Sequence, residues 1–257
     1  MKKIFIIISW ILVISTIIFI PLTFNKCIDV SSFIDFIVFI DPGHGGKDNG
    51  ATYLDIYEDE INLSIAKKLY EKCISKNLIA YISRTDDYDL ASLYAKNRKN
   101  EDLFKRVENI NHSGCDVFIS IHVNKYPTND VNGPMVYYDK NNEYSYLLSK
   151  NIQKELNILS NKNKTVHYED FYLFKNCTKP GVIVECGFIS NEEERSKLID
   201  DKYQQAIVDA LYQGIYNYYL NNWNPFFVNN KKILLTNNIT FYKMKYQKIA
   251  FLCYFLN

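Results

Sequence analysis

Short apolar runs alternate with amphipathic segments through the middle of the chain. The apolar runs are rich in β-branched residues and are bounded by Gly, Pro, Asn or Asp, which is the pattern of buried strands. Predicted strands cover residues 36–40, 78–83, 115–122, 135–138, 171–174 and 181–185. The run at 115–122 is apolar enough to lie in the centre of a parallel sheet.

The segments between these runs repeat apolar residues every three or four positions, as a helix with one buried face does. Predicted helices cover residues 58–73, 103–110, 148–156 and 206–218. Asn191 is expected to cap a further short helix that begins at Glu192. Because strands and helices alternate, we predict a single three-layer α/β domain at residues 36–220, with a mostly parallel central sheet flanked by helices.

The amino-terminal segment has a different pattern. Lys2 and Lys3 precede an uncharged apolar run at residues 4–24, which is about long enough to cross a bilayer, and the lysines favour a cytoplasmic amino end. No small-residue cleavage motif follows, so residues 1–25 are predicted to be an uncleaved transmembrane signal-anchor, with a cleaved signal peptide as the alternative. Residues 26–35 are then a linker. In both cases the remainder is expected outside the cytoplasmic membrane, anchored by residues 4–24 or secreted.

The composition excludes few classes of binding partner. The net charge of the 257 residues is +1, so neither nucleic acid nor an anionic membrane surface is expected as the main partner. None of the six cysteines lies in a Cys-x-x-Cys pair, and Cys73 and Cys186 fall in apolar segments, which predicts buried free thiols. The tail at 221–257 mixes Asn-Lys runs with short apolar patches. A hairpin, a partner-docking segment and a frameshifted product all stay open for it.

Two histidines and two glutamates fall near the ends of predicted strands. His44 lies in a Gly-rich loop after the first strand, His122 ends the third, and Glu185 ends the last. The carboxyl ends of parallel strands meet at one sheet edge, and Glu58 begins the helix that returns from the His44 loop. Two imidazoles and one carboxylate, with a fourth position open, form a catalytic zinc set. The second carboxylate is then free to act as a general base.

Each of these residues also has a plainer interpretation. The glutamate at the helix start can be a solvated acid, and Glu60 competes with it for any role. His122 in an apolar strand can equally be a hydrogen-bonded core residue. Glu185 is harder to explain in this way, because a buried unpaired carboxylate is costly. His112 is expected at the surface, and His167 is expected to have no role unless it touches substrate.

Five segments that follow one another along the chain carry a resemblance to a known family. They are Asp41-Pro-Gly-His-Gly-Gly with Asp48-x-Gly-Ala51, Glu58-x-x-Ile-Asn-Leu63, Arg106-Val with Asn111, Asp116-Val-Phe-Ile-Ser-Ile-His-Val-Asn124, and Val184-Glu-x-Gly-Phe-Ile-Ser-Asn191. Over residues 36–220 the chain resembles the zinc-dependent N-acetylmuramoyl-L-alanine amidases, which cleave peptidoglycan. With an anchor and a bare catalytic domain, it is similar to the CwlD-type sporulation amidases.

The resemblance implies roles for individual residues. His44, Glu58 and His122 match the zinc ligands of the family, with Glu58 favoured over Glu60, and Glu185 matches its catalytic glutamate. Zn²⁺ is therefore the expected cofactor and peptidoglycan the expected substrate. The implied reaction is hydrolysis of the amide between the lactyl group of N-acetylmuramic acid and L-alanine, in spore cortex maturation, where the product feeds muramic-δ-lactam formation.

The resemblance also leaves points open. An accessory activator protein is a candidate partner, because some members of the CwlD-type group need one. The alternatives to the amidase are a zinc carboxypeptidase or deacetylase of the wall, and a non-catalytic or partner-dependent wall-binding scaffold. Two residues depart from the family pattern near the expected substrate groove. Lys175 stands where many relatives have arginine, and Lys125 follows Asn124 where a small residue is usual.

Overall fold

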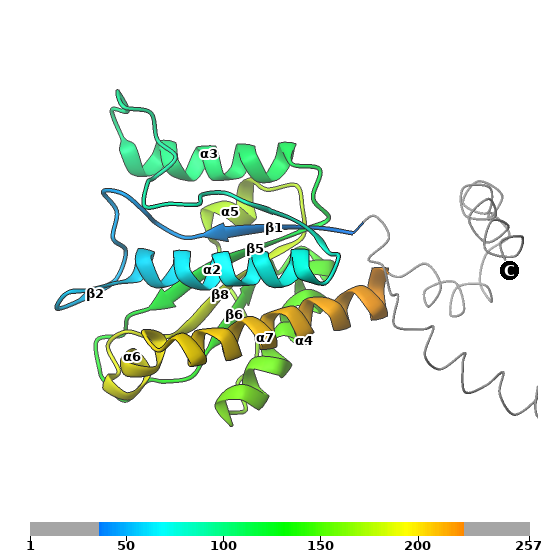
Figure 1. The fold of residues 1–257 in the computed structure, drawn as a ribbon. Helices are drawn as coiled ribbons and strands as arrows, with labels where there is room; N and C mark the ends of the chain where they lie inside the picture. The colour runs from blue at the N-terminus through cyan, green and yellow to red at the C-terminus, as the bar shows by residue number, and fades with distance from the viewer. Residues whose placement is uncertain (1–35, 224–257) are drawn as a thin grey trace, which may run out of the picture.

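A six-stranded sheet forms the middle layer of the protein, in the order β4-β1-β5-β8-β6-β7 (Figure 1). The structure is a computed structural model and describes residues 36–223. The strands are β1 (Ile37–Pro42), β4 (Ile79–Ile82), β5 (Val117–Asn124), β6 (Met135–Tyr138), β7 (His167–Tyr168) and β8 (Gly181–Phe188). The first four strands of this order are parallel, and β6 is antiparallel to β8. The prediction of a mostly parallel sheet is confirmed.

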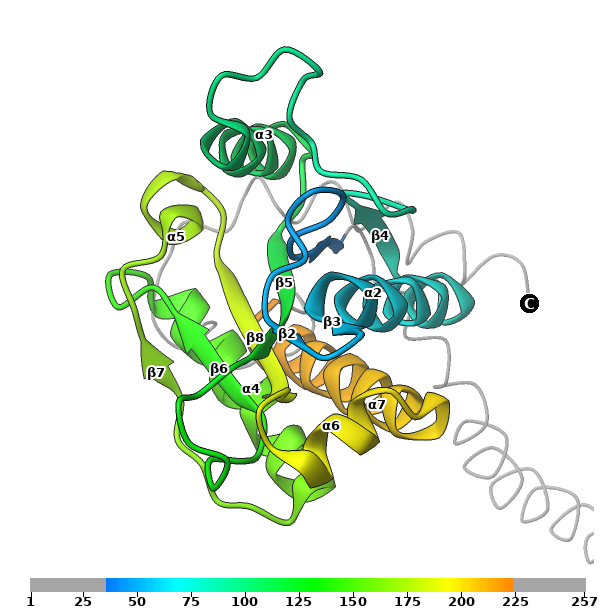
Figure 2. The same ribbon diagram turned by 90° about the vertical axis from the view of Figure 1, so that its left-hand side faces the viewer.

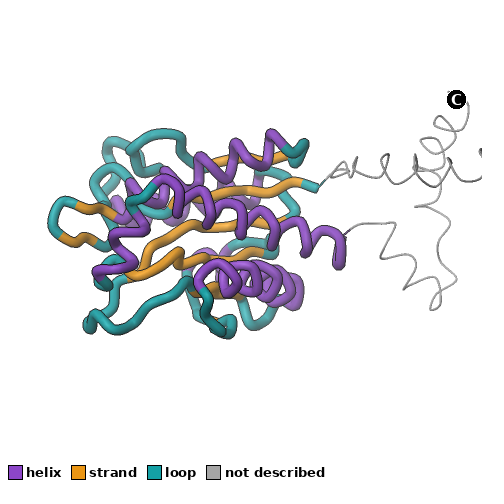
Figure 3. Tube along the Cα trace, turned by 60° about the horizontal axis from the view of Figure 1, so that its bottom comes forward, coloured by secondary structure: helices purple, strands orange, loops and turns teal. Residues whose placement is uncertain are grey.

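Helices cover both faces of the sheet (Figures 2 and 3). One face packs against α2 (Glu58–Ser75), α4 (Glu143–Ser160) and α7 (Asp201–Tyr218), and the other against α3 (Arg98–His112) and α5 (Tyr172–Asn176). The remaining elements are a small hairpin and two short helices: β2 (Thr52–Tyr53), β3 (Ile56–Tyr57), α6 (Glu192–Leu198) and the π-helix η1 (Tyr219–Trp223). Asn191 caps α6 by accepting from Glu194 N, as predicted.

The central strands are apolar because both of their faces are buried. Val38 and Ile40 of β1 belong to the core beneath α2 and α7, whereas Phe39 between them packs with Phe118 beneath α3 and α5. Consecutive side chains of a strand point to opposite faces, so a strand covered on both sides reads as a continuous apolar run. The predicted free thiols are confirmed, since Cys73 and Cys186 are buried and form no disulfide.

Several sequence predictions differ from the structure. The strand predicted at 171–174 is wrong: Tyr172–Asn176 is the helix α5, in which Leu173 and Phe174 turn into the core. A four-residue apolar run has no period that separates a strand from a helical turn. The ends of the third and last predicted strands are also wrong, because β5 continues to Asn124 and β8 to Phe188, where these residues pair. His122 and Glu185 therefore lie inside the strands.

The predicted signal-anchor at 1–25, the linker at 26–35 and residues 224–257 of the tail lie outside the described residues. Within residues 36–223, none of the helices combines the length and apolar character that a membrane span requires.

Candidate metal centre

His44 lies in the loop that follows β1. Its backbone has a φ of 60°, in the left-handed region that residues other than Gly rarely adopt. Gly45 and Asp48 close the loop through two backbone hydrogen bonds of 2.9 and 3.2 Å. The Nδ1 atom of His44 lies 2.9 Å from Oδ2 of Asp48. Asp48 therefore orients the imidazole and leaves Nε2 directed into the site.

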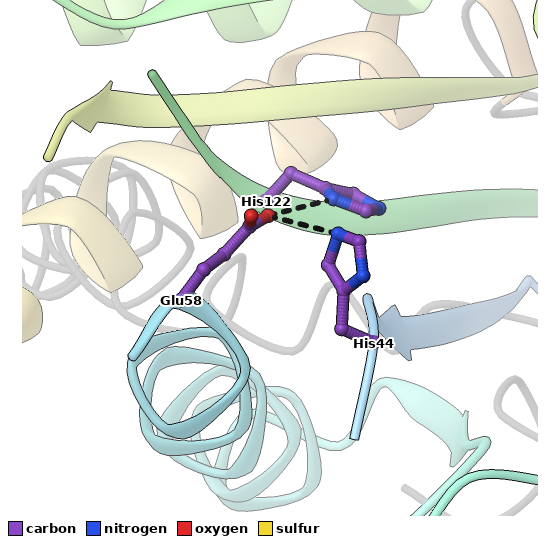
Figure 4. A group of neighbouring side chains, drawn as sticks. All are labelled: His44, Glu58 and His122. Carbon is purple, nitrogen blue, oxygen red and sulfur yellow. Dashed lines mark hydrogen bonds and ion pairs between the residues drawn. The ribbon is translucent and has the colours of Figure 1, made fainter. Parts of the chain in front are cut away.

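Glu58 is the first residue of α2, and its side chain meets both histidines (Figure 4). Its Oε1 atom lies 3.4 Å from Nε2 of His44 and 3.0 Å from Nδ1 of His122. One possible ligand atom from each of the three residues lies within 4.8 Å of the others. The three side chains come from a loop, a helix and a central strand, and they converge on one point at the carboxyl edge of the sheet.

Two backbone amides and one side-chain amide hold the Glu58 carboxylate in place. Ala51 N donates to Oε2 at 2.6 Å, Val123 N donates to Oε1 at 3.1 Å, and Asn62 Nδ2 donates to Oε1 at 3.2 Å. Burial alone would raise the pKa of Glu58, but hydrogen bonds and charge from His122 and His44 lower it well below its usual value. The carboxylate is therefore ionised, as a metal ligand must be.

Two buried arginines fix the backbone around His44. Three successive carbonyls, those of Pro42, Gly43 and His44, accept hydrogen bonds from them. Arg84 donates to Pro42 O at 3.2 Å and to Gly43 O at 3.0 Å, and Arg106 donates to Pro42 O at 2.7 Å and to His44 O at 2.6 Å. Each carbonyl is held by a rigid guanidinium, so the position of the His44 loop is set from the core side.

Arg106 is itself neutralised by two acids. Its Nη1 atom lies 2.6 Å from Oδ1 of Asp41 and its Nε atom 2.8 Å from Oδ2 of Asp102. Asp41 is fully buried and also accepts from Ser83 and Ser120. The ion pair with Arg106 keeps the pKa of Asp41 below its usual value despite the opposing effect of burial.

Glu185 faces the same site from β8. It is the direct neighbour of His122 on the adjacent parallel strand, and both residues line a cavity of about 180 Å³. Its Oε2 atom is shielded from solvent and has no hydrogen-bond partner within the described part of the chain. Burial raises the pKa of Glu185 to about 7, against the opposing charge of His122. The site therefore combines an ionised carboxylate with one that can exchange a proton near neutral pH.

Comparison with known proteins places this arrangement in a family. Residues 38–217 match the family described as N-acetylmuramoyl-L-alanine amidase. The chain belongs to this family. The germination-specific N-acetylmuramoyl-L-alanine amidase of Bacillus subtilis (strain 168) is 34% identical over 194 residues, which are 74% of this chain and 82% of that protein.

Two solved amidase structures are similar throughout the described region. The CwlD amidase from Clostridioides difficile, solved in complex with the GerS lipoprotein, is 36% identical, with a TM-score of 0.69 over 72% of this chain and 98% of that one. An N-acetylmuramoyl-L-alanine amidase from Clostridium difficile 630 is 30% identical, with a TM-score of 0.65 over 73% and 98% of the two chains. The predicted resemblance to the amidase family and to its CwlD-type members is confirmed.

The other residues singled out in the sequence do not belong to the group of three converging side chains. Glu60 is exposed on α2, and the rings of His112 and His167 are at the surface. The His167 ring packs 5.8 Å from that of Tyr137. Lys175 is exposed on α5 and pairs with Asp170 at 3.7 Å.

Lys125 contacts the segment between two of the converging residues. It follows β5, and its Nζ atom donates to Thr52 O at 3.0 Å in the β2–β3 hairpin. Arg195 stacks on Tyr53 of the same hairpin, 3.6 Å from the ring centroid. This hairpin joins the His44 loop to Glu58. Lys125, which departs from the family pattern, therefore stabilises the segment that connects His44 with Glu58.

The sequence analysis assigned no role to four residues that support this candidate metal centre. Asp48 and Asn62 hold the side chains of His44 and Glu58, and each stands four positions after the residue that it holds. That spacing was a usable signal. The contacts of Arg84 and Arg106 with this loop are recognisable only from the fold, because the carbonyls they bind lie more than forty residues away.

Proposed function

We propose that this amidase uses zinc, held by His44, Glu58 and His122, to hydrolyse the amide between the lactyl group of N-acetylmuramic acid and L-alanine in peptidoglycan. The convergence of these three side chains beside the unpartnered carboxylate of Glu185 is the observation that carries the proposal. Membership of the amidase family supports the choice of bond.

The donor set suits zinc. Two imidazole nitrogens and one carboxylate oxygen are the ligands of catalytic zinc sites, which keep a further position open. Asp48 behind His44 is the carboxylate partner that such ligands usually have. A bound Zn²⁺ supplies Lewis acidity, which polarises a carbonyl group and lowers the pKa of water.

Glu185 is proposed to move the proton. As the base, its carboxylate accepts a proton from the water that attacks the lactyl carbonyl carbon, and as the acid it returns that proton to the leaving nitrogen of L-alanine. A pKa of about 7 suits both steps, because proton transfer is most effective when the pKa lies near the working pH. The lack of another partner for Oε2 leaves this oxygen free for the water.

The products identify the bond that is cleaved. Zinc-loaded full-length protein is incubated with purified peptidoglycan, and mass spectrometry follows the new end groups. Stem peptides with a free L-alanine amine, together with glycan carrying bare lactyl groups, are the expected products. Released D-amino acids would indicate a carboxypeptidase, and released acetate a deacetylase. No product with zinc bound would favour a scaffold or a missing partner.

The relatives support a setting for this reaction. One is named germination-specific, and the CwlD relative was solved with a lipoprotein. We therefore propose that this enzyme acts outside the cytoplasmic membrane in spore cortex maturation, with help from an accessory protein. A catalytic domain at 36–220 and an anchor at 4–24 complete the proposal. Intact-mass measurement tests the anchor, because loss of the first two dozen residues would indicate a cleaved signal.

Zinc affinity is expected to fall as the pH falls. Burial lowers the pKa of His44, but the Glu58 and Asp48 carboxylates outweigh this and raise it to about 9. Below pH 9, His44 of the metal-free protein therefore holds a proton that zinc must displace. The Kd for zinc is expected to rise about tenfold for each unit by which the pH is lowered. Chelator competition at pH 6.5, 7.5 and 8.5 measures this. A Kd that is constant over that range would contradict the assignment of His44.

Gly50→Ala is expected to disrupt the site, whereas Gly114→Ala is not. Both glycines have left-handed φ angles, of 65° and 72°, so both substitutions carry the same backbone strain of about 1–2 kcal/mol. A Cβ at Gly50 would lie 2.5 Å from Oε2 of Glu58 and 2.7 Å from Cδ2 of His44, but one at Gly114 meets nothing within 4 Å. Only the first should weaken zinc binding, by about 10–100-fold. Equal zinc affinity in the two variants would contradict this geometry.

A further inference from the structure

A concave groove runs along α4. Figure 2 shows α4 on the side of the molecule away from β4. One wall is the exposed face of α4 from Tyr146 to Ile158, and the other is the segment at 162–166 that leads to β7. The groove is open to solvent and has a volume of about 570 Å³. The thirteen residues from Tyr146 to Ile158 are separated by twelve helical rises, so the groove is about 18 Å long. None of the residues that line it belongs to the metal centre.

Four lysines line this groove and no Asp or Glu does: Lys150, Lys154, Lys162 and Lys164. None of the four forms an ion pair within residues 36–223. Some other lysines of the described chain do form ion pairs: Lys68–Asp201, Lys72–Asp209, Lys105–Glu108, Lys175–Asp170 and Lys197–Glu193. In a protein of net charge +1, the groove is therefore a local concentration of positive charge.

Two glutamates attract these lysines through charge, but each glutamate is hydrogen-bonded to other groups. Glu194 attracts Lys164, but its carboxylate accepts from Gly133 N at 2.6 Å and from Phe188 N at 2.9 Å. Glu193 attracts Lys162 and is bonded to Lys197 at 2.6 Å. Burial and the neighbouring charge of Lys162 lower the pKa of Lys164. The ammonium groups of Lys162 and Lys164 therefore repel one another in the folded protein, and a bound anion would reduce that repulsion.

Hydrogen bonds hold the two walls of the groove together. Asn157 of α4 donates to Lys164 O at 2.8 Å and accepts from Lys164 N at 3.1 Å, and its own carbonyl accepts from Lys162 N at 3.1 Å. Two of the ammonium groups lie over aromatic rings. The Nζ atom of Lys150 is 5.4 Å from the ring centroid of Tyr146, and the Nζ atom of Lys164 is 5.4 Å from the ring centroid of Phe188. The groove is therefore shaped before any ligand arrives, which reduces the entropy lost on binding.

We propose that this lysine groove binds a linear phosphodiester polymer. The cations that line the groove are all ammonium groups, which bind phosphate as point charges. An open concave groove along a helix suits an extended strand, whereas a membrane surface would need a protruding face. The proposal goes beyond the amidase reaction and does not depend on it. Binding here would hold the enzyme against an anionic polymer while the catalytic edge of the sheet stays free.

The test uses the full-length protein in detergent and a synthetic poly(glycerol phosphate) as the probe, with calorimetry over a range of salt concentrations. Two double variants remove the charges pairwise: Lys162→Gln with Lys164→Gln, and Lys150→Gln with Lys154→Gln. A matched double variant, Lys76→Gln with Lys202→Gln, removes the same charge from exposed sites outside the groove. Circular dichroism and amidase activity verify that all three variants fold.

Each groove variant should bind the probe about tenfold or more weakly, and the slope of log K against log salt should become shallower by about one for each lysine removed. The matched variant should bind like the wild type. Equal losses in all three variants would overturn the site. Equal binding of poly-L-glutamate would overturn the choice of phosphate. Loss of binding to anionic phospholipid vesicles in the groove variants, without loss of polymer binding, would assign the groove to a membrane instead.

Discussion

Glu185→Gln is expected to lower kcat by about 10²–10⁴-fold while the protein still binds one zinc ion. Glutamine has nearly the same shape but cannot accept and return a proton. Because Glu185 is not among the three converging residues, zinc content should be unchanged. Mass spectrometry of released stem peptides measures the rate, and elemental analysis measures the metal.

Two further variants separate the roles in this experiment. His122→Ala should lose both zinc and activity, because it removes a proposed ligand. Glu60→Gln should keep both, because Glu60 is an exposed acid on the same helix as Glu58. Near-normal turnover in Glu185→Gln would show that another group moves the proton. Loss of zinc in Glu185→Gln would instead place Glu185 among the ligands.

Arg106→Ala is expected to reduce the free energy of unfolding by about 3–5 kcal/mol. The substitution leaves the fully buried Asp41 without its counter-charge, and it also removes donors from the carbonyls of Pro42 and His44. An unpaired buried carboxylate is among the most destabilising changes that a core can undergo. Urea unfolding followed by circular dichroism gives the difference.

The neighbouring Lys105 supplies the matched control. It pairs with Glu108 on the exposed face of the same helix, so Lys105→Ala should change stability by no more than about 1 kcal/mol. Arg106→Lys should recover part of the loss, because the ammonium restores the charge but not the several directed bonds. If Arg106→Ala and Lys105→Ala were equally stable, the buried ion pair would have no net structural role.

Local pattern was enough to predict most of the fold. The continuous apolar runs of β1 and β8 and the four-residue apolar repeat of α2 depend on neighbours in the chain, so they are visible in the sequence. The run at 171–174 failed because it is too short to show a period.

The sequence also determined which residues to examine. Polar side chains after or within apolar strands are unusual enough to mark His44, His122 and Glu185 without a structure, and the parallel order of the strands brings them to one edge. The family resemblance then distinguished Glu58 from Glu60.

Only the tertiary structure decided how these residues are held and charged. The arginine contacts to the His44 loop and the pairing of His122 with Glu185 join segments more than forty residues apart. The same holds for charge: the lysines of the groove look like any others along the chain, and the absence of Asp and Glu from the groove lining depends on which distant side chains fold beside them. Burial and charge at a site are sums over spatial neighbours, and these are set by packing rather than by order along the chain.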